Sequence, residues 1–181
     1  MTPGGRIHHR SAIGWVLAVA LAASQSASPA DADPCTGFSW DMTRVRTLFA
    51  SAPQSLQAGR DAQQAPPLSI ARLYELQLAP QTQTHPALPP GKHSDDQHSF
   101  AGLARLQLEH AGNYRISLDR PGWIDVVAGS AAIDSSGFQG RPGCSAPHKS
   151  VQFALPAHQA LLLQFSAVSD SQLRVTITPA E

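Results

Sequence analysis

The second half of this chain alternates apolar and polar side chains in short runs. The first run lies between Leu73 and Leu78, where Glu75 and Gln77 separate Tyr74, Leu76 and Leu78. Six more follow, at residues 99–110, 111–118, 123–129, 149–156, 160–168 and 171–179. Runs of this length and period predict β-strands with one buried face.

The alternation also indicates which side chains face the core. We expect the following to point inward: Tyr74, Leu76, Leu78, Ala104, Leu106, Leu108, Tyr114, Ile116, Leu118, Ile124, Val126, Val151, Phe153, Leu155, Leu161, Leu163, Phe165, Leu173, Val175 and Ile177. Short strands separated by tight turns are typical of an antiparallel sandwich or barrel. The predicted fold is therefore an all-β, antiparallel, jelly-roll-like β-sandwich of about eight strands.

The segment before these strands follows a different pattern. Val45, Leu48 and Phe49 fall on one helical face, and Asp41 can cap or charge the start, which predicts a short helix near residues 40–50. Residues 52–67 contain Pro and Gly without periodicity and are expected to be irregular surface chain. Residues 81–97 hold three prolines and no apolar run, and are expected to form an exposed loop prone to disorder or proteolysis.

The amino terminus has the pattern of a secretory signal. Arg6 and Arg10 precede an apolar run at residues 11–23, which is shorter than the roughly 20 residues that a transmembrane helix needs. Cleavage fits after Ala30 or after Ala32. We expect a signal peptide at 1–30, a helix and irregular segment at 31–67, a β-sandwich domain at 68–181, and a periplasmic or secreted protein.

Charge excludes some classes of partner. After position 30 the chain carries eleven basic and thirteen acidic residues, so it is close to neutral or slightly negative. A nucleic-acid footprint or a polybasic membrane contact needs a basic patch. The expected partner is a periplasmic protein or a glycan, with no nucleic acid and no membrane span in the mature chain.

Cys35 and Cys144 both follow the signal segment. Cys144 lies within six residues of His148 and Lys149, either of which can lower a thiol pKa and activate a nucleophile. However, two cysteines in an oxidising compartment favour a disulfide, and glycines and prolines surround Cys144. We therefore expect a Cys35–Cys144 bridge that pins a loop, and no catalytic residue.

Other residues are candidates for a site. His93, Asp95, His98 and His148 are metal-ligand types, but the first three stand in a proline-rich polar loop without the alternating spacing of a cupin iron site, so no metal or cofactor is expected. Asp125 interrupts an apolar strand and is either solvated or paired, with Arg115 or Lys149 as partners. Tyr114 and Trp123 form either part of the core or a platform for a sugar ring.

Several blocks of sequence carry a resemblance. They are FSWDMTRVRTLFA, GLARLQLEHAGNYRISLDRPGWIDVVAG, GCSAPHKSVQFALP and LLLQFSAV. Together they resemble a group of small exported proteobacterial proteins of uncharacterised function, some of which are labelled homogentisate 1,2-dioxygenase. The resemblance implies a recurring exported domain. The iron ligands of homogentisate dioxygenases, two His and a Glu, have no counterpart in this chain, so no catalytic residue is transferred.

Two functions from different classes follow. The first is a non-catalytic exported module that binds a ligand, glycan or protein. The second is a metal-dependent enzyme of cupin-like shape, with His93, His98 and either Asp95 or His148 as ligands.

Overall fold

The computed structural model describes Met1, Thr2, Gly4 and residues 33–92 and 98–180. Apart from its first residues, the predicted signal peptide therefore lies outside the described residues. In the part of the chain that is described, no helix combines the length and the apolar character needed to cross a bilayer.

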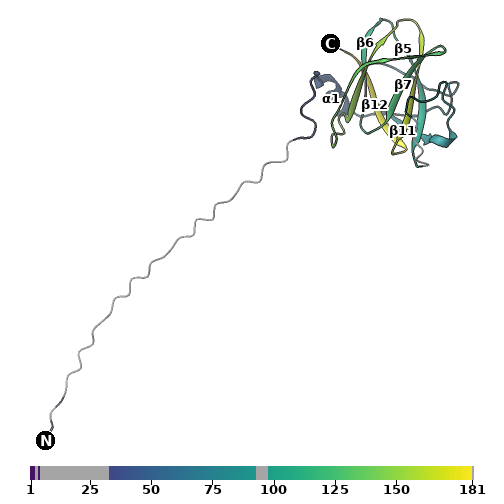
Figure 1. The fold of residues 1–181 in the computed structure, drawn as a ribbon. Coiled ribbons are helices and arrows are strands. Elements are labelled where there is room, and N and C mark those ends of the chain that lie inside the picture. The colour runs from purple at the N-terminus through teal and green to yellow at the C-terminus, as the bar shows by residue number, and fades with distance from the viewer. Residues whose placement is uncertain (3, 5–32, 93–97, 181) are drawn as a thin grey trace. The chain divides into compact units, whose positions relative to one another are not determined.

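Two sheets make up the fold (Figure 1). The first sheet has the order β1 (Gln54–Gln57), β3 (Leu73–Gln77), β12 (Gln172–Pro179), β6 (Gly112–Leu118), β10 (Lys149–Leu155) and β9 (Ser135–Gly140). The second sheet has the order β2 (Pro67–Leu68), β5 (Phe100–Gln107), β11 (Ala160–Val168), β7 (Trp123–Ala128) and β8 (Ala131–Ile133), with β4 (Ala79–Pro80) also paired to β5. All seven predicted strands are present.

The strand order is that of a jelly roll. The eight strands that define it are β3-β12-β6-β10 in the first sheet and β5-β11-β7-β8 in the second, so the chain crosses repeatedly from one sheet to the other. These eight strands form the two facing four-stranded sheets of that fold. The prediction of a jelly-roll-like β-sandwich is confirmed.

Some details differ from the sequence prediction. Residues 52–67, expected to be irregular, supply β1 and the start of β2, which pair in parallel with β3 and β5. The sheets are therefore not purely antiparallel. Residues 131–140 form β8 and β9 rather than a simple turn-rich crossover. The prediction missed these strands because none of them has an apolar alternation of its own, and β1, β2 and β8 are also short.

The main core lies between the two sheets. Every side chain predicted to face inward belongs to this core cluster. In Figure 1, β6 and β12 of the first sheet lie nearer to α1 (Thr43–Phe49), and β5, β7 and β11 of the second sheet lie farther from it. Alternation identified the correct faces because successive strand side chains point to opposite sides of a sheet.

The amino-terminal segment, residues 33–49, covers the outer face of the first sheet. Val45 and Phe49 of α1 are buried against Leu73. The N-cap residue of α1 is Met42, whose side chain makes no capping hydrogen bond; the Asp41 Oδ1 before it accepts a hydrogen bond of 2.8 Å from the Thr43 N–H at the helix start. That backbone hydrogen bond is the main reason why the pKa of Asp41 lies below its usual value.

Three aromatic side chains of this segment stack on arginines. The guanidinium carbon of Arg115 lies 4.7 Å from the centroid of the Trp40 ring. Two similar pairs form at longer distances, Arg141 with Phe38 at 5.1 Å and Arg174 with Phe49 at 5.8 Å. A planar guanidinium stacks on rings better than an ammonium does, which gives a structural reason for the preference for Arg over Lys in this chain.

A proline-rich loop covers the outer face of the second sheet. Leu88 of this loop packs against Val127, Leu162 and Leu103. Its described part, residues 81–92, lies at the surface with no buried residue, as expected; it begins with the 3-10 helix η1 (Gln81–Gln83) and is hydrogen-bonded to the second sheet, which was not predicted. Residues 93–97 lie outside the described residues.

Candidate functional site

The inner face of the first sheet is left open at its edge strand, β9. Phe138 pairs with Val151, and paired residues of neighbouring strands point to the same face. Val151 is buried in the core, whereas Phe138 is 72% exposed. The second sheet therefore does not cover this part of the inner face, and an apolar ring is presented to solvent.

Lys149 lies beside this open face, at the start of β10. Its Nζ donates a hydrogen bond of 2.9 Å to the Gly122 carbonyl and lies 5.1 Å from the centroid of the Trp123 ring. Burial is the main cause that lowers the pKa of Lys149, and the positive charge of Lys92 lowers it further. Among the described residues no carboxylate lies within ion-pair distance of this ammonium, and Asp125 attracts it only from farther away.

Trp123 is held in place by Asp125. The Trp123 Nε1–H donates to Asp125 Oδ1 at 2.8 Å, and the Gly91 N–H donates to the same carboxylate at 3.1 Å to Oδ2. A Cβ at position 91 would lie only 2.7 Å from Trp123 Nε1, so the loop approaches this closely because residue 91 is a glycine. Asp125 is thus paired, as one of the alternatives expected, but with Trp123 and Gly91 rather than with Arg115.

These residues line two adjoining cavities, which together we call the edge groove. The smaller cavity has a volume of about 180 Å³ and is lined by Trp123, Ile124, Ser135, Phe138, Lys149 and Val151. The larger cavity, about 400 Å³, shares Trp123, Ile124 and Ser135 and extends towards Asp125, Asp134 and the loop at Leu88 to Gly91. Both ends of the edge groove are largely apolar; one end carries the ammonium of Lys149, and the other carries the carboxylates of Asp125 and Asp134.

The cysteines are joined. Cys35 and Cys144 form a disulfide with an S–S distance of 2.03 Å and a Cα–Cα distance of 4.9 Å. Neither thiol is free, so Cys144 is not an available nucleophile. His148 lies in the same loop, where its backbone N–H donates to the Leu118 carbonyl at 2.8 Å. The predicted bridge is confirmed.

The metal-ligand candidates are only partly described. His93 and Asp95 lie outside the described residues, so a site that contains them stays a prediction. Within residues 33–92 and 98–180, no group of three or more His, Cys, Asp or Glu side chains is placed to hold a metal ion, and His98 and His148 belong to no such group.

Tyr114 and Trp123 do not form a common platform. Tyr114 is 6% exposed within the core, and its hydroxyl donates to the His110 carbonyl at 2.8 Å. It lines a cavity of about 270 Å³ with Ile70 and Leu108, whereas Trp123 lines the edge groove. A ring that stacks on Trp123 would meet Phe138 and Lys149 as neighbours instead.

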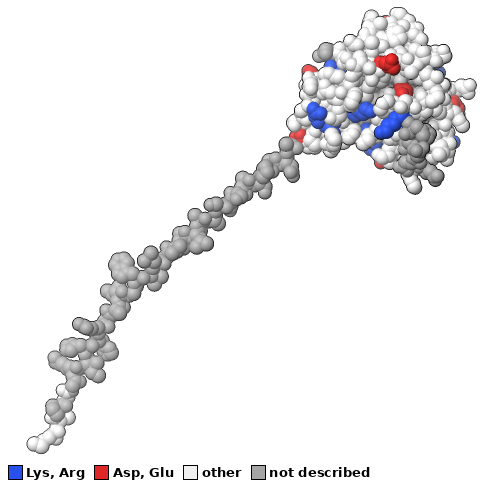
Figure 2. Space-filling view, in the orientation of Figure 1, with Lys and Arg blue, Asp and Glu red and all other residues white. Residues whose placement is uncertain are grey.

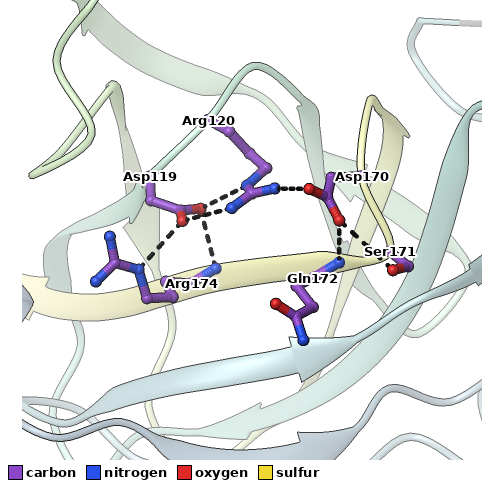
Figure 3. A network of polar contacts seen from close by, with 6 residues as sticks. All are labelled: Asp119, Arg120, Asp170, Ser171, Gln172 and Arg174. Carbon is purple, nitrogen blue, oxygen red and sulfur yellow. Dashed lines mark hydrogen bonds and ion pairs between the residues drawn. The ribbon is translucent and has the colours of Figure 1, made fainter.

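A second cluster of charges has a structural role. The Asp119 side chain is only 2% exposed and accepts four hydrogen bonds, two from Arg120 and two from Arg174 (Figure 3). Arg120 also contacts Asp170 at 2.6 Å, and Asp170 accepts from the Gln172 N–H. Both carboxylate oxygens of Asp119 are thus occupied by the chain's own donors. The cluster fastens two turns and β12 to each other.

Charges on the surface are dispersed. Figure 2 shows small separate groups of basic and acidic side chains on one face, with uncharged surface between them. This distribution differs from the continuous basic stripe that nucleic-acid binding needs.

Several residues of the edge groove and of these networks were not singled out by the sequence pattern. Phe138 stands between two glycines, outside any alternating run. Lys149 was predicted as the start of a strand, as a neighbour of Cys144 and as a partner for Asp125, but not as part of a groove. Gln164, whose side chain bonds the backbone of Ala87 and Leu88, could have been found from the sequence. It is a lone amide within the apolar run LLLQF, and a buried polar group needs hydrogen-bond partners.

The fold and the edge groove define a disulfide-linked jelly-roll sandwich with a cavity at one sheet edge. No family model, curated protein or solved structure matches this chain.

Proposed function

We propose that this protein is an exported, non-catalytic binding module, and that its ligand occupies the edge groove. One observation carries the proposal: the inner face of the first sheet is uncovered at β9, where Phe138 is exposed beside the half-buried Lys149. An exposed ring and a desolvated charge are unfavourable in an empty groove. A ligand that covers both would offset that cost.

Export is part of the same proposal. The signal-like amino terminus and the Cys35–Cys144 disulfide both support an oxidising compartment. Cell fractionation with amino-terminal sequencing tests it. We expect mature protein outside the cytoplasm that begins at Asp31 or Asp33; uncleaved protein in the cytoplasm would contradict export.

A screen by NMR tests the binding role. Isotopically labelled, naturally processed protein is mixed with a library of neutral, anionic and cationic aromatic compounds and of sugars. We expect some compounds to shift the indole N–H signal of Trp123 and the amide signals of Ser135 and Phe138. If all compounds leave the edge groove signals unchanged, the site is wrong.

The same purified protein can be used to test the other classes of ligand and the metal-enzyme alternative. A glycan array and periplasmic crosslinking test whether a glycan or a protein occupies the edge groove instead of a small molecule. Elemental analysis of protein purified without chelators or a His tag tests the metal-enzyme alternative. Stoichiometric iron, zinc or manganese would favour that alternative over the binding module.

A further inference from the structure

We infer that the smaller cavity of the edge groove binds a small aryl carboxylate, with the ring between Trp123 and Phe138 and the carboxylate on Lys149. This inference rests on the proposed function and adds the chemical class of the ligand. Three features support this ligand class: the size of the smaller cavity, the apolar character of its walls and the charge of Lys149 beside it.

The smaller cavity by itself has room for about one ring. A cavity of roughly 150 Å³ lined by apolar side chains accommodates a benzene molecule. The smaller cavity measures about 180 Å³, which leaves room for a single six-membered ring with a small substituent. An oligosaccharide would extend far beyond it.

The walls favour an apolar ring over a sugar. Ile124, Phe138 and Val151 offer only carbon atoms, and Ser135 supplies the one hydroxyl. A sugar ring carries several hydroxyl groups, each of which loses its hydrogen bonds to water when it is buried without a partner. An aromatic ring has no such groups and gains from offset or edge contacts with Trp123 and Phe138.

The charge favours an anion. An ammonium has three N–H donors, and Lys149 uses one on the Gly122 carbonyl. Lys92 and Lys149 are the only lysines after position 30, and they lie close enough to repel each other. Because the carboxylate of Asp125 is bound to Trp123 and Gly91, a ligand carboxylate would be the first close counter-ion of Lys149 apart from any in the undescribed residues 93–97.

Matched probes test the inference on naturally processed protein. Benzoate has the ring and the charge, benzamide has the ring without the charge, acetate has the charge without the ring, and glucuronate has the charge on a sugar. We expect benzoate to shift the Trp123 indole signal and to bind at least about tenfold more tightly than benzamide, the usual scale of a charge-assisted hydrogen bond. Acetate and glucuronate should produce no saturable shift.

Variants separate the contributions of the ring and the charge. Lys149→Met should abolish the preference for benzoate over benzamide, and Lys149→Arg should keep most of it. Phe138→Ser should weaken both ring probes about equally and leave the unfolding temperature unchanged, because that side chain is already exposed. The control Arg72→Gln also removes one positive charge, but Arg72 does not line the edge groove and contacts the exposed Gln54, so benzoate binding should not change.

The outcomes distinguish the inference from the proposed function. Equal affinity of the wild type for benzoate and benzamide, or a preference for benzoate that survives Lys149→Met, would overturn the inference. If neutral library compounds shift the edge groove signals and benzoate does not, the binding module stands and the ligand class is wrong. If no compound shifts those signals, both are wrong.

Discussion

Asp125 and Gln164 lie opposite each other on β7 and β11, and both side chains bind the backbone of the same proline-rich loop. Gln164 Oε1 accepts from the Ala87 and Leu88 N–H groups at 2.6 and 3.2 Å, and Gln164 Nε2 donates to the Leu88 carbonyl. Asp125 accepts from the Gly91 N–H. One cross-strand pair thus fastens the loop to the second sheet and also orients Trp123 at the edge groove.

Replacement of Gln164 should release this loop. Gln164 is 2% exposed, and Gln164→Ala leaves partly buried backbone groups of Ala87 and Leu88 without partners, so it should reduce the free energy of unfolding by about 1 to 3 kcal/mol. Thermolysin cleavage at Leu88 and urea unfolding measure the two effects. The exposed Gln172→Ala is the control and should change neither. Unchanged cleavage at Leu88 in Gln164→Ala would show that the hydrogen bonds do not hold the loop.

Asp119 should be far more important for stability than Asp170. Asp119→Ala removes a buried carboxylate and leaves the half-buried Arg174 without its counter-charge, whereas Arg120 keeps Asp170, so the loss should be about 1 to 3 kcal/mol. Asp170 is exposed, and exposed ion pairs contribute roughly 0 to 1 kcal/mol, so Asp170→Ala should have a small effect. Denaturant unfolding of both variants measures the difference. Similar losses of unfolding free energy in the two variants would contradict the argument that burial makes Asp119 the more important carboxylate.

The contribution of Asp170 to the stability of the fold should be present at neutral pH and be lost in acid. The Gln172 N–H chiefly, with help from Arg120, holds the pKa of Asp170 below its usual value of 3.8. A carboxyl whose pKa is lower in the folded state stabilises the fold above the unfolded pKa, and this contribution is lost as the pH falls through the folded pKa. Wild type should therefore exceed Asp170→Asn in unfolding temperature at neutral pH, and the gap should close below pH 3.8. A gap that widens in acid would reverse the sign and refute the assignment.

Removal of the disulfide should destabilise the protein without altering the sandwich core. Closing a loop between residues 109 positions apart contributes roughly 4 to 5 kcal/mol in the chain-entropy model, and the double variant Cys35→Ser, Cys144→Ser should lose about that much. Thiol titration of the native protein should detect no free thiol, and reduction with unfolding should yield both. Two thiols that can be alkylated in the native state would remove the basis of this prediction and weaken the case for export.

The amino-acid pattern by itself determined the sandwich and the faces of its main strands. Alternation identified Ile116, Leu163 and Val175 as inward-facing residues because strand geometry imposes a period of two whatever the neighbours are. The bridge between Cys35 and Cys144 followed from their even number and from the predicted oxidising compartment. Both inferences use only local geometry or composition.

Contacts between distant segments decided the rest. Phe138 has no distinctive neighbours in sequence, and its exposure depends on where the second sheet ends. Lys149 became a candidate site residue only when Trp123 and Lys92, from other parts of the chain, were placed beside it. The packing of residues 81–92 likewise depends on Gln164 and Asp125, which follow the loop by many residues. Such contacts arise from the arrangement of strands in three dimensions, which a one-dimensional period does not record.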